Sequence, residues 1–317
     1  MIVVTGAAGG LGRLVVNRLV LDYQMPVVAG TRNPDKLKPG LPASVSVRRI
    51  DFDDPSSLAE GFTGADVVLL VSAGQAEHDV VINRHGAAVE AAEKAGVRHL
   101  VYTSLTGAGD HLAMALPHRW TEHRLARGTT TWTVLRNGLY AELLVADTAH
   151  AVATRALTAP LGAGRVAAVA REDLADAAAR VLAKAAADVR ATQPGRHANK
   201  TYELVGDTAI GGTDLTTIAS DIAGNPVAYR PGSLADRRAA LTDAGMPHWR
   251  IDHVISIYAT IAAGFLSSTD SVLTDLLGTA SRPALSLVTA AVHSETRPAP
   301  QPTDSTGRTG RRGQPHR

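Results

Sequence analysis

The feature that most constrains this chain is a glycine-rich turn near its amino end. A short β-branched run, Ile2-Val3-Val4, is followed by Gly6, Gly9 and Gly12 at intervals of three residues. Gly6 permits a tight turn that a Cβ would block, Gly9 lets backbone amides approach a diphosphate, and Gly12 lets the next helix pack closely. The N-terminus of such a helix attracts phosphate. The sequence therefore predicts a dinucleotide-binding turn, with a nicotinamide cofactor as its ligand.

The residues around the glycines support this prediction. Leu11, Val15 and Leu19 recur every four residues, as on the apolar face of a helix. The turn residues that we expect to bind the cofactor are Gly6, Gly9, Gly10, Leu11 and Gly12. The alternative is an ordinary turn between a strand and a helix in a sheet protein that has no cofactor.

Composition narrows the classes of protein that fit. The chain has 317 residues, 45% of them hydrophobic, which is enough for a large core in one domain or two. It has no cysteine, so disulfides, zinc–thiolate sites and a thiol nucleophile are excluded, and we expect no metal site. Aromatic residues make up only 4%, which argues against a stacking surface for single-stranded nucleic acid. We expect no membrane span and no leader peptide, and therefore a cytoplasmic protein.

Charge is distributed unevenly along the chain. Residues 296–317 contain five arginines and one aspartate, so the other residues of this +2 chain carry a net charge of −2. The end is rich in Pro, Gly, Thr and Arg without apolar periodicity, which predicts a disordered basic tail. Binding of nucleic acid by Arg308, Arg311 and Arg312 is the less favoured interpretation, because a solvated terminal extension is commoner.

Apolar runs alternate with helix-like stretches in the first half. The expected strands are 2–4, 27–30, 45–50, 67–71, 100–102 and 131–135, and the expected helices include 78–95 and 117–127. This alternation predicts an α/β fold, a Rossmann-type doubly wound parallel sheet with helices on both faces. Ligands bind such a sheet at the carboxyl ends of its strands.

The pattern changes after about residue 154. We expect a NAD(P)-binding domain over 1–154 and a smaller α-rich substrate-binding region over 155–295, followed by the tail. An alanine-rich helix is expected over 171–187, and a short strand near 201–205 is a candidate to rejoin the main sheet.

The segment after the second expected strand distinguishes the two nicotinamide cofactors. A carboxylate that binds the ribose of NAD is absent there, and Arg32 offers a guanidinium to the 2′-phosphate of NADP(H). The alternative for Arg32 is a surface side chain. Phe52 is expected at the edge of the adenine. Ser72, Ala73 and Gly74 are expected along the ribose, although a plain turn fits these small residues equally well.

Taken together, these residues resemble the NmrA-like atypical short-chain dehydrogenase/reductase family, and within it the bacterial NAD(P)H:quinone oxidoreductases. The matching segments are 5–12, 32–36, 95–97, 102–105, 118–122, 135–140, 171–175 and 202–206, within a resemblance that runs from Met1 to about Val292. The most specific of them is Leu-Arg-Asn-Gly-Leu-Tyr at 135–140. The resemblance implies that Asn137 and Gly138 lie along the nicotinamide and that Thr103 lies below it.

The sequence departs from the wider family in two respects. No tyrosine has a lysine four residues later, so the Tyr-x-x-x-Lys pair that serves alcohol–ketone chemistry is missing. His123 stands where many of the close relatives carry lysine, which puts in doubt an acid–base role inferred for that helix. The missing pair also argues against an epimerase or a dehydratase of the extended family.

Reduction of a quinone is compatible with the absence of a Tyr-x-x-x-Lys pair, because a quinone is a strong hydride acceptor and its reduced oxygen needs little acid catalysis. We therefore expect an NADPH-dependent oxidoreductase with a small quinone-like substrate. His118 and Tyr140 are the candidate catalytic residues, and packing roles for both are equally favoured. The alternative function is a non-catalytic NAD(P)-binding redox sensor of the NmrA type. Either protein could form an oligomer.

Overall fold

The computed structural model describes residues 1–73, 76–193 and 195–296, and within them the chain forms a seven-stranded parallel sheet. The strands are β1 (Ile2–Val4), β2 (Val27–Thr31), β3 (Ser46–Arg49), β4 (Val67–Leu70), β5 (His99–Leu105), β6 (Thr131–Asn137) and β9 (Lys200–Leu204). Their order is β3-β2-β1-β4-β5-β6-β9, so the direction of winding reverses beside β1. This order confirms the predicted Rossmann-type sheet and places its switch point at the glycine turn.

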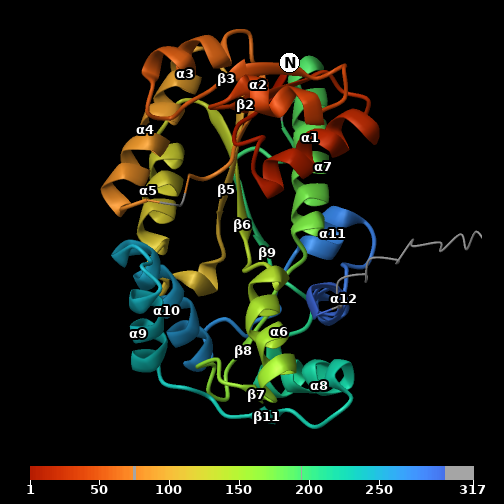
Figure 1. Cartoon of the computed structure of the whole chain (residues 1–317). Coiled ribbons are helices and arrows are strands. Elements are labelled where there is room, and N and C mark those ends of the chain that lie inside the picture. The colour runs from red at the N-terminus through yellow and green to blue at the C-terminus, as the bar shows by residue number, and fades with distance from the viewer. Residues whose placement is uncertain (74–75, 194, 297–317) are drawn as a thin grey trace, which may run out of the picture.

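Helices cover both faces of the sheet (Figure 1). One face carries α1 (Gly10–Leu21) and α7 (Arg171–Arg190), and the other carries α3 (Pro55–Phe62), α4 (His78–Lys94) and α5 (Ala115–Ala126), while α2 (Pro34–Leu37) follows β2. Val4 and Leu69 pack in the core on the α1 side, and Val3 and Val68 pack in the core on the α4 side. Because both faces of the central strands are buried, their sequences are apolar without alternation.

A second core lies at the carboxyl end of the sheet. Its elements are α6 (Val145–Thr154), α8 (Gly212–Ala223), α10 (His248–Ala262), α12 (Ala284–Thr296) and the strand pairs β7 (Ala156–Leu157) with β11 (Ala228–Tyr229) and β8 (Arg165–Val166) with β10 (Ile210–Gly211). Helix α9 (Leu234–Asp243) has no buried residue and packs against α10. Leu105 at the end of β5 and Leu139 just after β6 belong to this core. The helical region therefore sits directly on the edge where Rossmann sheets bind ligands (Figure 1).

Part of the sequence after residue 154 packs with the sheet. The strand expected near 201–205 is β9, which pairs in parallel with β6 and so rejoins the main sheet as predicted. Helix α7 packs against α1, and α11 (Leu273–Leu277) packs against α7. The domain boundary at 154 stays a prediction. Of the expected tail, 296–317, only Thr296 is among the described residues, where it ends α12.

The strands that carry the site are longer than expected. β5 and β6 extend to Leu105 and Asn137, which pair with one another in register. Their last residues include threonine, serine, arginine and asparagine, so the apolar signal ends before the strands do. Among the described helices, none combines the length and the apolarity needed to cross a bilayer.

Candidate functional site

The glycine turn joins β1 to α1 at the switch point of the sheet. Gly6 has a φ of +60°, in the left-handed region that favours glycine, and its carbonyl accepts a hydrogen bond from the amide of Gly9 (N···O 2.9 Å). A Cβ on Gly12 would stand 2.5 Å from the carbonyl oxygen of Gly6, so the close packing of α1 requires glycine there. The first amides of α1 have no acceptor within the helix, which is the arrangement that binds phosphate.

A cleft of about 430 Å³ opens beside this turn, at the carboxyl ends of β1 to β4. It brings together predicted cofactor residues from four segments of the chain. These are Gly6, Gly9, Arg32, Phe52, Ser72 and Ala73. Gly74 lies outside the described residues. The remaining wall consists of Ala8, Thr31, Ile50, Asp51, Asp53, Val71 and Arg84.

Other predicted residues surround the cleft without lining it. Leu11 is buried in the core on the α1 side, and Gly12 packs against the turn, so both support the cleft. Thr103 accepts a hydrogen bond from the amide of Ser72 at 2.9 Å and thereby holds the loop after β4. Their contact with a cofactor stays a prediction.

Asn137 and Gly138 stand at the end of β6, on the same edge of the sheet. Asn137 is 6% exposed, and its Oδ1 is a buried acceptor with no partner among the described residues. Because buried polar atoms almost always have a partner, this oxygen points to a donor supplied by a ligand. The amide of Gly138 donates to the carbonyl of Leu204 (2.8 Å), which fixes this segment against β9.

The outer wall of the cleft contains an ion pair that sequence reasoning missed. Arg84 of α4 donates to both carboxylate oxygens of Asp53 at 2.7 and 2.6 Å, and this bond lowers the pKa of Asp53. Arg32, which is exposed, lowers the pKa of the same carboxyl further. The sequence had no signal for Arg84, because only the packing of α4 brings it to the loop after β3. Asp54 caps α3 by accepting from the amide of Ser56.

His118 lies in a buried polar cluster rather than on the wall of the cleft. Its Nδ1 contacts the hydroxyl of Tyr102 at 2.8 Å. The neighbouring His85 accepts a hydrogen bond from the amide of Ala73 at Nε2 (2.8 Å) and contacts Thr121 through Nδ1. Burial lowers the pKa of His118 to about 4 and that of His85 to about 3, so both rings are neutral at pH 7. The role of His118 as a proton donor stays a prediction.

Tyr140 stands between the glycine turn and the second core. The guanidinium of Arg171, at the start of α7, lies over its ring at 4.8 Å from the centroid. A Cβ on Gly10 would stand 2.9 Å from Nη1 of the same arginine, so Arg171 bridges the turn and Tyr140. Burial raises the pKa of Tyr140, which keeps its hydroxyl protonated.

Arg136 and Glu122, from two of the matching motifs, form a structural network near this edge. Arg136 pairs with Glu122 of α5 at 2.7 Å and with Glu203 of β9 at 3.1 Å. Glu122 also accepts from the hydroxyl of Ser104. The network ties α5 to the ends of β5, β6 and β9.

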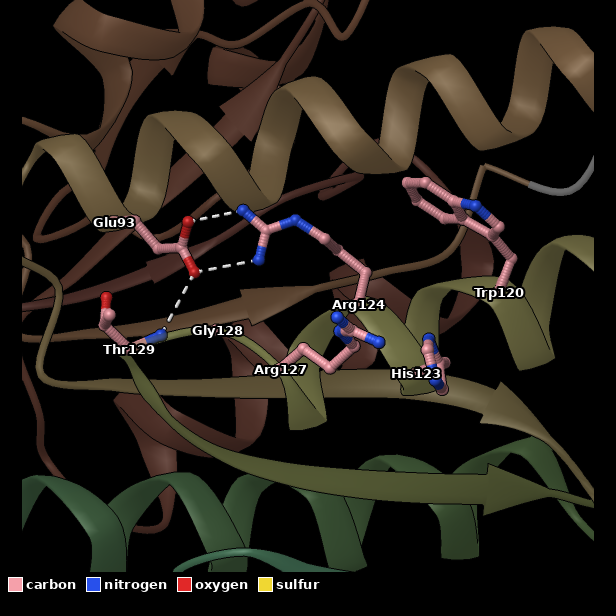
Figure 2. Close-up of a pocket in the computed structure, with 7 residues that line it drawn as sticks. All are labelled: Glu93, Trp120, His123, Arg124, Arg127, Gly128 and Thr129. Carbon is pink, nitrogen blue, oxygen red and sulfur yellow. Dashed lines mark hydrogen bonds and ion pairs between the residues drawn. The ribbon is translucent and has the colours of Figure 1, made fainter.

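A separate surface hollow of about 480 Å³ shares no lining residue with the cleft. Figure 2 shows Glu93 held there by both terminal nitrogens of Arg124 and by the amide of Thr129. His123 also lines this hollow. Glu93 and Arg124 are paired with one another, and His123 lies apart from the cofactor residues.

Comparison with known proteins identifies the family of the chain. A family model described as NAD(P)H-binding matches residues 6–185, more than half of the chain. Quinone oxidoreductase 2 of Escherichia coli is 32% identical over 280 residues, which cover 88% of this chain and 94% of that protein. An NmrA-like family domain-containing oxidoreductase of Aspergillus flavus is 26% identical, covering 87% of this chain and 89% of its own.

Solved structures agree with the sequence relatives. The E. coli NADPH-dependent quinone oxidoreductase complexed with NADPH superposes with a TM-score of 0.82, at 32% identity, over 92% of this chain and 99% of its own. The triphenylmethane reductase of Citrobacter sp., complexed with NADP(H), has a TM-score of 0.80 at 30% identity, over 94% of this chain and 100% of its own. The chain belongs to the NmrA-like, NAD(P)H-binding family of atypical short-chain dehydrogenase/reductases.

Proposed function

We propose that this protein is an NADPH-dependent oxidoreductase that reduces a quinone-like acceptor. The observation that carries the proposal is the wall of the cleft after β2, where Arg32 is exposed beside the glycine turn and no carboxylate directly follows the strand. A guanidinium there favours the 2′-phosphate of NADP(H) over the free hydroxyl of NAD(H). The relatives named as quinone oxidoreductases support the acceptor class.

The residues present fit a dinucleotide. The amides of the glycine turn and the start of α1 would hold the diphosphate, Arg32 the 2′-phosphate, and Asn137 Oδ1 an amide donor of the nicotinamide end. When bound, NADPH supplies the hydride. The chain itself provides orientation and excludes water from the edge formed by β5 and β6.

Tyr140 is the residue that we expect at the acceptor. Because burial raises its pKa, its hydroxyl remains a hydrogen-bond donor and can orient a quinone oxygen. A quinone oxygen is far less basic once reduced than an alkoxide, so water can supply the single proton that, with the hydride, completes the hydroquinone. This explains how the reaction proceeds without a Tyr-x-x-x-Lys pair.

Stopped-flow absorbance of NADPH with menadione tests the proposal. We expect the purified protein to accelerate loss of NADPH well above the uncatalysed rate, and NADH to be used less efficiently. Tyr140→Phe, which removes the hydroxyl and keeps the ring, is expected to lower kcat/KM for menadione with little change in NADPH affinity. An unchanged rate of NADPH loss on adding the protein would refute the reaction.

A redox sensor is the second candidate, and the missing Tyr-x-x-x-Lys pair favours it. The two functions differ in turnover. A sensor binds NADP(H) tightly while menadione, azo dyes and triphenylmethane dyes all fail to oxidise the bound NADPH.

We also infer that the protein acts in the cytoplasm and that it can form an oligomer. Cell fractionation tests the first inference, and light scattering on the eluting protein tests the second. Material confined to the membrane fraction, or a strictly monomeric mass, would contradict them.

A further inference from the structure

We propose that an apolar pocket beside Tyr140 binds the alkyl or isoprenoid side chain of a lipophilic acceptor. This inference rests on the proposed reaction and adds the substrate class. The pocket has a volume of about 200 Å³ and lies between the segment after β6 and helix α10. At roughly 30 Å³ for each methylene-sized group, it holds on the order of six or seven of them.

The walls of the pocket are aliphatic. Leu139, Leu143 and Leu144 form one side, and Val254, Ile257 and Ile261 of α10 form the other. No charged side chain is among the lining residues that the structure describes. Such a surface favours a hydrocarbon chain, because each methylene that it buries contributes to affinity. A polar group buried there would lose its hydrogen bonds to water and find no partner on these walls.

The polar groups nearest the pocket are already engaged. Tyr258 lines the pocket, but its hydroxyl donates to Asp147 and accepts from Arg237. The tyrosine therefore offers its ring to the pocket and has no hydroxyl hydrogen left for a polar headgroup. This wall is therefore more complementary to an apolar chain than to a polar ring.

The pocket adjoins the site where the acceptor ring is expected. Tyr140 lines it and is also covered by Arg171, which in turn lies against Gly10 of the cofactor turn. A ring held at the Tyr140 hydroxyl can thus extend a side chain into the pocket. Leu143, which is 51% exposed, stands at the opening to solvent, through which such a chain can enter.

Equilibrium dialysis with saturating NADP⁺ tests this inference without turnover. The two probes are menadione and a menadione derivative with a hexyl chain on its quinone ring. We expect the wild-type protein to bind the hexyl derivative at least about tenfold more tightly than menadione, because burial of only two methylenes already accounts for such a factor. Val254→Phe fills the pocket and is expected to reduce this ratio to about one. Val254→Thr keeps the volume, adds a hydroxyl to the wall, and is expected to reduce the ratio several-fold.

Ala263→Phe is the matched control, because it introduces the same side chain at the exposed end of α10, outside the pocket, and should keep the tenfold ratio. Equal affinities for the two probes in the wild type, or a ratio that survives both Val254 variants, would overturn the proposal. If Val254→Phe abolished the binding of menadione as well as that of its hexyl derivative, the proposal would also be overturned, because the quinone ring itself would then occupy the pocket. If the hexyl preference is present and menadione does not oxidise NADPH, the proposed reaction fails and the alkyl pocket stands.

Discussion

The cofactor cleft and the apolar pocket beside Tyr140 are adjacent, yet different parts of the chain build them. The cleft is formed by backbone and by short loops that directly follow β1 to β4, within the first 84 residues. The pocket is formed by side chains from two segments, 139–168 and α10. More than eighty residues of sequence separate the end of the first segment from the pocket residues of α10. The first site is encoded by local motifs, whereas the second depends on how the helical region packs. Substitutions should therefore separate dinucleotide affinity from acceptor affinity.

The largest expected effect comes from Gly12→Ala. Its Cβ would stand 2.5 Å from the Gly6 carbonyl oxygen, so α1 must shift away from the turn. We expect a loss of about 1–3 kcal/mol in the free energy of unfolding. Calorimetry should also show that NADPH binding is lost. Gly86→Ala on α4, where the Cβ would meet only the ring of Trp120, is the control and should bind NADPH normally. Tight NADPH binding by Gly12→Ala would show that the close packing of α1 is dispensable.

Arg32→Ala tests the specificity of the cleft. Loss of a charged hydrogen bond to the 2′-phosphate should raise the Kd for NADPH about tenfold to a hundredfold. The Kd for NADH should change little, since NADH lacks that phosphate. Isothermal titration with both nucleotides measures the difference. An equal loss for NADH and NADPH would assign Arg32 to the shared part of the cofactor instead.

Asp147→Asn tests the acceptor side alone. Asp147 of α6 is held by Arg237 of α9 and Tyr258 of α10, so its charge joins the helices around the pocket. We expect a several-fold rise in KM for the hexyl quinone and a free energy of unfolding lower by about 1–3 kcal/mol. NADPH affinity should be preserved. A parallel loss of NADPH affinity would show that the two regions do not act separately.

The last effect is absent at neutral pH and appears only on the acid limb of stability. In the folded protein the pKa of His118 is about 4, against 6.5 for the ordinary group. As pH falls from 6.5 towards 4, the unfolded chain takes up a proton that the folded chain does not. The free energy of unfolding then falls by up to about 1.4 kcal/mol per pH unit for this residue.

Thermal melts between these two pH values measure this loss. His118→Gln should show a shallower decline in Tm than the wild type, while His123→Gln, at an exposed position, should match the wild type. Identical declines in all three proteins would mean that His118 takes up no extra proton on unfolding.

The contrast between local motifs and packing of separate elements also explains which features could be predicted from the sequence. The sheet, many of its helices and six of the thirteen residues that line the cleft were predictable, because glycine spacing, apolar runs and Arg32 are signals within single segments. The burial of His118 against Tyr102 and the Arg84–Asp53 pair were not, because each joins separate elements whose packing has no local signature. The ends of β5 and β6 were missed for a related reason, since polar residues there continue the pairing of the two strands beyond the apolar run.

Titration calorimetry of the wild-type protein with NADPH, and with NADH in parallel, tests the central claim most directly. We expect saturable binding of NADPH at one site per chain and binding of NADH that is at least about tenfold weaker. If neither nucleotide released heat or raised the melting temperature at saturating concentration, the glycine turn would not be a dinucleotide site and the account would be contradicted.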